Sequence, residues 1–113
     1  YVEDTCSGFY EIYNSDALFG EVVNIGMNDE ISIGDLAMLI ASIMNIEINI
    51  KSKENRFRPE NSEVERLVCD NTRLIKNTKW RPKYNLEKGI SEVVNWLKDP
   101  KNQKIYKEGI YNV

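Results

Sequence analysis

The chain has 113 residues, of which 29% are charged and 42% hydrophobic, and its formal net charge is −3. This length fits one domain, and the composition is ordinary for a soluble globular protein. No apolar run approaches the roughly 20 residues of a membrane span, and the acidic balance argues against nucleic acid as a partner. The sequence has no histidine and two widely spaced cysteines, which argues against zinc sites and favours a reduced, cytoplasmic protein.

The first half of the chain predicts two helices and two extended runs. Asp4 is a candidate cap for a helix through Tyr13, whose inward residues are Cys6, Phe9, Ile12 and Tyr13. Residues 21–26 form a β-rich run, and residues 46–50 alternate apolar and polar side chains like a half-buried strand. Between them, Ser32 begins the clearest helix and Asn45 suits its end. Its apolar face consists of Ile33, Leu36, Ala37, Ile40, Ile43 and Met44.

The second half predicts a surface loop followed by shorter helices. Residues 52–62 are polar and aperiodic, and a short helix around 71–78 has Asp70 or Asn71 as its cap. Pro82 interrupts the chain before a further helix, which Asn85 caps and Pro100 ends or bends. Residues 101–113 form a basic tail. The expected fold class is α/β, as an α+β unit of about five helices and a small sheet of about three short strands.

Catalytic signatures are sparse in this sequence. It has no glycine-rich phosphate loop and no nucleophile elbow. Tyr84 and Lys88 have the spacing of a catalytic tyrosine and its lysine, but Tyr84 precedes the predicted cap at Asn85, so the two should not share a helical face. A packing role for Tyr84 and Trp80 at the Pro82 turn is therefore favoured.

A charged segment between residues 56 and 66 is the richest candidate for binding. It contains three arginines and three glutamates, namely Arg56, Arg58, Glu60, Glu63, Glu65 and Arg66. A guanidinium group suits a phosphate bidentately, and a carboxylate accepts hydrogen bonds from ribose hydroxyls. The alternative is a solvated loop with local ion pairs, and composition alone favours that interpretation.

Six short motifs in order carry a resemblance to a known family. They are Tyr1-Val2-Glu3-Asp4-Thr5 with Gly8, Asn24-Ile25-Gly26, Glu30-Ile31-Ser32-Ile33, Arg58-Pro59 with Glu63-Val64, Cys69-Asp70-Asn71, and Trp80-x-Pro82-x-Tyr84-x-Leu86-Glu87-x-Gly89. Together they resemble the C-terminal part of the extended short-chain dehydrogenase/reductases that modify nucleotide sugars. The likeness is strongest to NAD-dependent 4,6-dehydratases and 4-epimerases.

The resemblance implies that residues 1–113 are a single substrate-binding lobe. The NAD-binding Rossmann domain and the catalytic residues of such an enzyme belong upstream and are absent from this chain, which opens at Tyr1. The lobe is then expected to bind no cofactor and to catalyse nothing alone, while NAD serves the parent enzyme. The parent's expected role is in cell-surface polysaccharide biosynthesis.

The same resemblance supplies roles for the charged segment. Arg58 matches the arginine that pairs with the substrate pyrophosphate, and Glu63 matches the acid that holds ribose hydroxyls just before a short strand. The segment looks about two residues longer than in relatives, so Glu60 or Glu65 are alternatives to Glu63. Arg56 and Arg66 complete the candidate set, and a UDP-sugar is the favoured partner.

Two other functions stay open at this stage. One is a stand-alone nucleotide-binding or protein-interaction module without an enzymatic parent. The other is a small DNA-binding helical domain, which only the basic tail supports. In the lobe hypothesis, exposed apolar surface is expected to cause self-association into a homo-oligomer.

Overall fold

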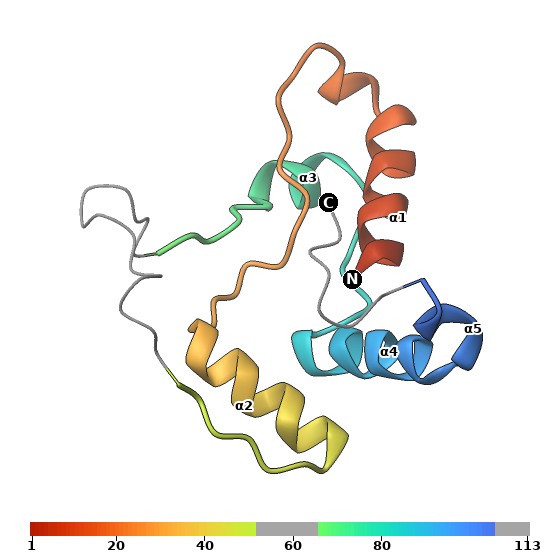
Figure 1. The fold of residues 1–113 in the computed structure, drawn as a ribbon. Coiled ribbons are helices and arrows are strands. Elements are labelled where there is room, and N and C mark those ends of the chain that lie inside the picture. Colours follow the sequence, from red (N-terminus) through yellow and green to blue (C-terminus); the bar gives the residue numbers. More distant parts are fainter. Residues whose placement is uncertain (52–65, 106–113) are drawn as a thin grey trace.

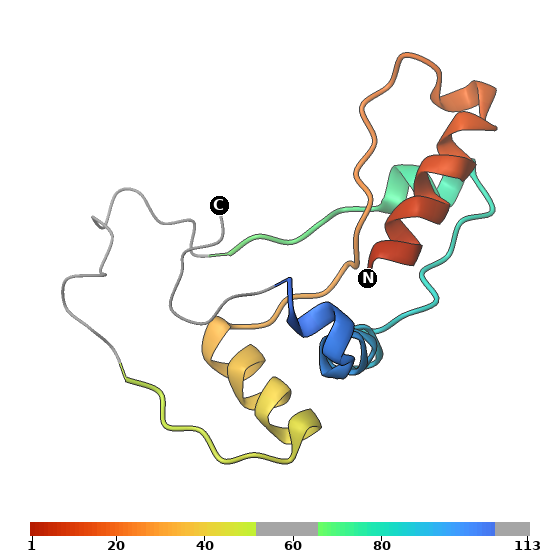
Figure 2. The ribbon, with the colours of Figure 1, turned by 45° about the vertical axis from the view of Figure 1, so that its right-hand side comes forward.

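A computed structural model describes residues 1–51 and 66–105, which form helices joined by long extended segments (Figure 1). The helices are α1 (Val2–Tyr13), the short 3-10 helix η1 (Asp16–Leu18), α2 (Ile33–Met44), α3 (Thr72–Asn77), α4 (Leu86–Lys98) and α5 (Pro100–Gln103). In both Figure 1 and Figure 2, α3 lies beside α1, whereas α2 lies near α4. The structure therefore has two groups of helices connected by the extended segments.

The prediction of an α/β fold with a small three-stranded sheet is wrong for the described residues, because none of them is in a strand. The runs 21–26 and 46–50 are extended but have no regular helix or strand assignment. A strand also needs a neighbour about 4.8 Å away that offers its backbone groups in register. In the described part of the chain, their backbone hydrogen bonds run to the helix just before each, from the Glu21 N–H to the Leu18 carbonyl and from the Ile46 N–H to the Ala41 carbonyl, and none joins two extended segments. The residue pattern of these runs therefore specified the extended conformation, but it did not specify a neighbouring strand.

The helix ends predicted at Ser32, Asn45 and Asn85 are confirmed. Ser32 Oγ accepts a hydrogen bond from the backbone N–H of Asp35 at 3.0 Å and donates one to the Asp35 carboxylate at 2.7 Å. Asn45 ends α2 in the left-handed conformation, with φ of 54°. At the start of α4, Asn85 Oδ1 accepts from the N–H of Lys88 at 2.9 Å. Capping involves groups within a few positions of one another, so local sequence reveals it.

The buried core is a small cluster around Trp80. Leu18 from η1, Leu74 from α3 and Trp80 are each almost fully buried, and partly buried residues pack against them, namely Ile12, Val23, Ile25 and Ile75. The Trp80 indole N–H donates to the carbonyl oxygen of Asp4 at 3.0 Å and lies 3.1 Å from Ser7 Oγ. The packing role predicted for Trp80 is confirmed, since it joins α1 to the segment that follows α3.

The inward face of α1 differs from the predicted one except at Ile12, which packs against the core as expected. Phe9 and Tyr13 are 64% and 87% exposed, and Cys6 is also exposed, whereas Asp4 and Gly8 are buried. A Cβ atom on Gly8 would lie 2.7 Å from Cγ2 of Ile25. The close approach of α1 to the 21–26 segment therefore requires glycine. Small and polar residues, rather than the aromatic ones, decide which face of α1 is buried.

Asp4 does not cap α1, contrary to the prediction. The helix begins at Val2, and its N-cap, Tyr1, makes no side-chain cap bond. The Asp4 carboxylate instead accepts hydrogen bonds from the backbone N–H groups of Lys83 at 2.9 Å and Tyr84 at 3.0 Å. Asp4 thus fastens the chain after Pro82 to the first turn of α1.

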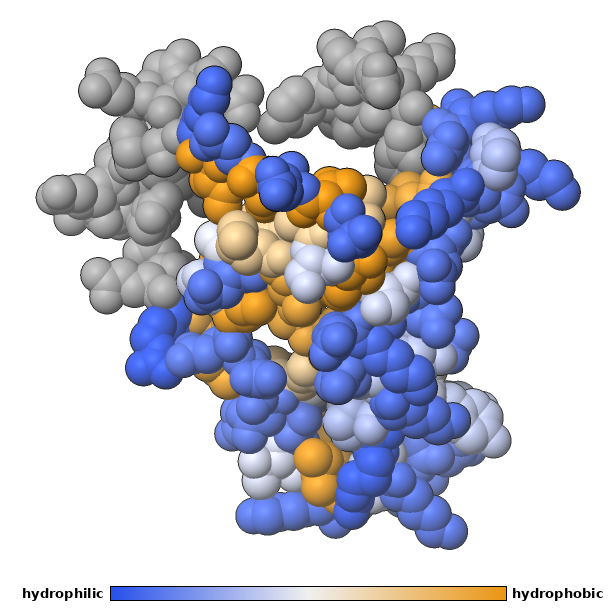
Figure 3. Space-filling view, turned by 90° about the horizontal axis from the view of Figure 1, so that it is seen from below, coloured by the Kyte–Doolittle hydropathy of each residue, from blue (hydrophilic) through white to orange (hydrophobic). Residues whose placement is uncertain are grey.

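A large apolar surface lies over α2, α4 and the segment after α2. Figure 3, viewed from below Figure 1, shows apolar side chains gathered in a band on this side of the molecule. Exposed members of this surface are Ile33, Met38, Met44, Ile46, Ile48, Ile50, Val93 and Leu97. Self-association through such surface stays a prediction. No described helix has both the length and the apolar character needed to cross a bilayer.

The role of Asp4 can be tested by Asp4→Ala. The change leaves the N–H groups of Lys83 and Tyr84 without their acceptor, so we expect the free energy of unfolding to fall by about 2–4 kcal/mol. Urea denaturation followed by Trp fluorescence measures the loss. Asp16→Ala, at an exposed site in η1, is the matched control and should cost about 0.5 kcal/mol or less. Equal losses in the two variants would contradict the assigned role.

The close approach of α1 can be tested by Gly8→Ala. The added methyl group meets the β-branched, stiff side chain of Ile25, so we expect a loss of about 1–3 kcal/mol in the free energy of unfolding. Gly34→Ala is the control, since the nearest atom to its new Cβ is Ser32 Oγ at 3.8 Å. Because alanine favours the helix, Gly34→Ala should leave stability unchanged or raise it by up to about 1 kcal/mol. A Gly8→Ala protein as stable as Gly34→Ala would refute the assignment.

Candidate functional site

Arg66 is the one residue of the predicted binding set that the structure describes. Arg56, Arg58 and Glu63 lie outside the described residues, as do the alternatives at 60 and 65. The Arg66 side chain is exposed and forms a two-point ion pair with Glu30, in which Nε donates to Oε2 at 3.0 Å and Nη2 donates to Oε1. Such bidentate pairs fix the orientation of a guanidinium group.

The ion pair lines a hollow at the amino end of α2. Its volume is about 370 Å³, and its walls include Glu30, Ser32, Asp35 and Arg66. Two carboxylates and one guanidinium give this hollow a formal charge of −1. The ion pair uses two of the five guanidinium N–H donors of Arg66. Because the net charge is negative, the hollow favours hydroxyl groups over a phosphate.

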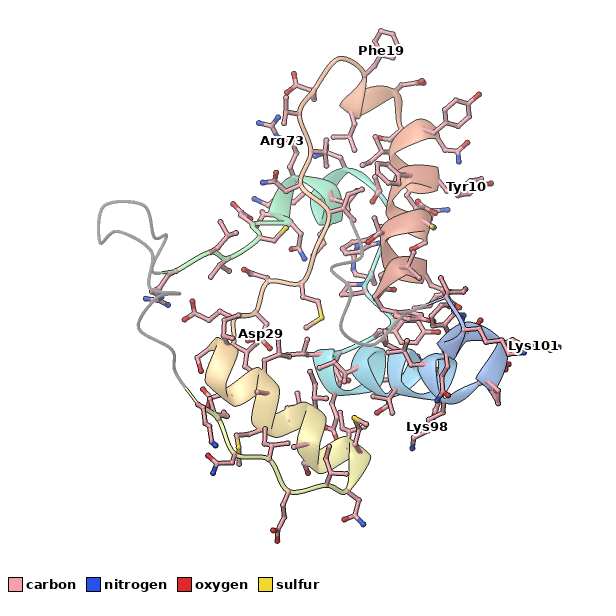
Figure 4. The ribbon with its side chains drawn as sticks, in the orientation of Figure 1. Tyr10, Phe19, Asp29, Arg73, Lys98 and Lys101 are labelled. Atoms are coloured by element: carbon pink, nitrogen blue, oxygen red, sulfur yellow. The ribbon has the colours of Figure 1, made fainter. Side chains whose placement is uncertain are left out.

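The loop at residues 27–31 lines this hollow and two others. A cavity of about 300 Å³ lies against Met27, Glu30 and Leu67, and one of about 540 Å³ lies against Met27 and Lys88. Asp29 borders both, and Figure 4 places its side chain at the amino end of α2. The 27–31 loop therefore forms a common wall along which hollows run from Arg66 to the start of α4.

Two of the predicted motifs contact each other and position this loop. Asn71 is buried, and its Nδ2 donates to the carbonyl oxygen of Gly26 at 2.8 Å. A Cβ atom on Gly26 would lie 2.9 Å from the Sγ atom of Cys69. Asp70 Oδ1 accepts from the N–H of Thr72 at 2.9 Å, and hydrogen bonding to Thr72 lowers the pKa of the Asp70 carboxyl. These motif residues hold the chain rather than offer free ligand groups.

Tyr84 and Lys88 lie together, although not as a catalytic pair. Tyr84 precedes the cap at Asn85, as predicted, yet the Lys88 ammonium lies 4.4 Å from the centroid of the Tyr84 ring. The Tyr84 hydroxyl donates to Glu3 Oε2 at 2.7 Å, and chiefly this hydrogen bond raises the pKa of Tyr84 to about 12. A tyrosine that acts as a base or nucleophile needs a lowered pKa, so the shift opposes a catalytic role.

Sequence reasoning missed Glu30 and Asn71 as partners of site residues. Both stand within recognised motifs, which is the signal that pointed to them, but their contacts lie 36 and 45 positions away along the chain. Local spacing carries no information on such contacts. Across the described ranges, no cluster of three or more Cys, Asp or Glu side chains has an arrangement suited to a metal ion.

No protein-family model matches the chain. No solved structure matches it either. A protein of Methanocaldococcus jannaschii named "Putative UDP-glucose 4-epimerase" is 33% identical over 79 residues, which is 70% of this chain. The aligned part is 24% of that relative, so the chain is similar to a portion of a much longer protein. This similarity loosely supports an origin related to nucleotide-sugar epimerases.

The raised pKa of Tyr84 can be tested by Glu3→Gln. Removal of the carboxylate acceptor should lower the pKa of Tyr84 from about 12 toward its ordinary value of 10.0, measured from tyrosine ring NMR shifts against pH. Because folding raises this pKa, the hydrogen bond stabilises the fold fully below pH 10 and is lost as the pH rises through about 12. Tyr84→Phe assigns the signal, and Glu11→Gln on the same helix is the control. An unchanged titration in Glu3→Gln would contradict the contact.

Proposed function

We propose that this chain binds a nucleotide-diphosphate sugar as part of an NAD-dependent epimerase or dehydratase. The observation that carries the proposal is the similarity over 79 residues to a relative whose name states UDP-glucose 4-epimerase. It agrees in direction with the resemblance that the six sequence motifs carry. Both indications come from the amino-acid sequence, and both support the same class of enzyme.

The charged segment is the proposed ligand site. Arg56 and Arg58 offer guanidinium forks that suit the two phosphates, and Glu63 offers a carboxylate for the ribose hydroxyls. The pair of Arg66 with Glu30 supports this assignment, since it ties the end of the segment to the amino end of α2. In this proposal Arg66 anchors the segment, and Arg56 and Arg58 bind the diphosphate.

Hydride transfer belongs, in this proposal, to NAD and to catalytic groups outside these 113 residues. The sugar's C4 loses a hydride to NAD and regains it at C4 in an epimerase, or C6 receives it in a dehydratase. The proposed contribution of this chain is to hold the nucleotide diphosphate so that the sugar faces the nicotinamide. The environment of Tyr84 supports the division, because its pKa is shifted away from the range useful for proton abstraction.

Calorimetric titration tests the proposed binding. We expect UDP-glucose to bind the chain, and Arg58→Ala to weaken binding at least about tenfold, because a charge-assisted pair with phosphate is lost. Lys98→Ala, at the carboxyl end of α4, is the control and should bind as the parent chain does. UDP and dTDP-glucose as further ligands resolve the contributions of sugar and base. Equal heats for Arg58→Ala and the parent chain would remove Arg58 from the site.

An interaction module is the second candidate, and the exposed aromatic residues favour it. Tyr13 and Phe19 are 87% and 93% exposed, which is unusual for large side chains of an isolated domain. Figure 4 shows Phe19 and Tyr10 pointing outward from η1 and α1. Absence of heat with every nucleotide sugar in the same titration would favour this candidate over the first.

A further inference from the structure

A hollow beside the 27–31 loop has features of a small-molecule site. Its volume is about 540 Å³, within the range of about 300–1,000 Å³ typical of ligand pockets. Apolar walls come from Met27, Ile75 and Pro82, and polar walls come from two lysines and three asparagines. Pockets of this composition bind ligands that have an apolar body and a charged group.

Two lysines, Lys83 and Lys88, line this hollow. Neither takes part in an ion pair in the described part of the chain, where the pairs join Arg66 to Glu30 and Arg73 to Glu21. The one acidic residue among the described lining residues is Asp29. Its Oδ1 accepts a hydrogen bond from the backbone N–H of Glu30 at 2.8 Å. The lining residues therefore have a formal charge of +1.

Lys88 is held in place without being neutralised. Its ammonium lies 4.4 Å from the centroid of the Tyr84 ring, a cation–π contact that orients the charge. The ring is fixed in turn, because the Tyr84 hydroxyl donates to Glu3 and the Tyr84 N–H donates to Asp4. Lys83 is placed by the same carboxylate, which accepts its backbone N–H at 2.9 Å. The Asp4 contacts thus bring both lysine positions to one wall of the cavity.

The amide groups around the cavity add positioned polar atoms. Asn71 is only 4% exposed, and its bond to Gly26 fixes the side chain. Asn85 caps α4, because its side-chain oxygen accepts a hydrogen bond from the N–H of Lys88.

We propose that this Lys83–Lys88 cavity binds a phosphate monoester of a small organic molecule. The lysine ammoniums take the phosphate, and Met27, Ile75 and Pro82 take the organic part. Among the described residues, the lining of this cavity does not include Arg66, and the proposal does not depend on the nucleotide-sugar site.

NMR titration of the 113-residue chain tests the site with three probes: glucose 1-phosphate, inorganic phosphate and glucose. We expect saturable shifts of the amides of residues 83–88 with glucose 1-phosphate, weaker ones with inorganic phosphate, and none with glucose. Lys83→Gln and Lys88→Gln should each weaken binding of glucose 1-phosphate by about tenfold. Lys88→Arg keeps the charge and should retain most of the affinity.

The control variants are Lys98→Gln and Lys101→Gln, at the opposite end of α4 and in α5 (Figure 4). They remove the same charge and should bind glucose 1-phosphate as the parent chain does. Equal weakening in these controls, or an absence of saturable shifts at residues 83–88, would overturn the proposal. Binding of glucose 1-phosphate that survives Arg58→Ala would separate this site from the nucleotide-sugar site, whereas loss in Arg58→Ala would overturn the claim that the two are distinct.

Discussion

The carboxylate of Asp4 is the contact on which the arrangement of the described residues depends. Asp4 is only 6% exposed. Its carboxylate accepts hydrogen bonds from the backbone N–H groups of Lys83 and Tyr84, which lie about 80 positions further along the chain. A buried carboxylate is costly unless such donors satisfy it. The Asp4 carbonyl oxygen also accepts the Trp80 indole N–H, so one residue of α1 holds both the core tryptophan and the turn before α4.

The candidate sites follow from this constraint. With Tyr84 fixed, its ring orients the Lys88 ammonium and its hydroxyl contacts Glu3, which turns a sequence pattern typical of catalysis into a wall of a cavity. The bond from Asn71 to Gly26 sets where the 27–31 loop begins. That loop then lines two chemically different hollows, one with the Arg66–Glu30 pair and one with the lysines.

The elements that local sequence predicted well are those whose determinants lie within one helical turn. Ser32, Asn45 and Asn85 mark helix ends because each bonds, or bends, the backbone of its immediate neighbours. The prediction of strands was wrong because the runs at 21–26 and 46–50 specify only an extended chain. A sheet also needs a partner segment in register. The prediction of the inward face of α1 was wrong for a related reason. Gly8 and Asp4 pack against segments distant in sequence, while Phe9 and Tyr13 are exposed.

The amino-acid sequence by itself determined the helix ends at Ser32, Asn45 and Asn85, the charged pattern at residues 56–66 and the motif order that resembles nucleotide-sugar enzymes. Only the tertiary structure decided that Asp4 fastens a distant turn, that Glu30 pairs with Arg66, and that Tyr84 has a raised pKa. The physical reason is the separation along the chain of the groups that interact. Caps and periodicity act over a few residues, whereas these contacts join groups from 36 to 81 positions apart, and only the packing of helices brings such groups within hydrogen-bonding distance.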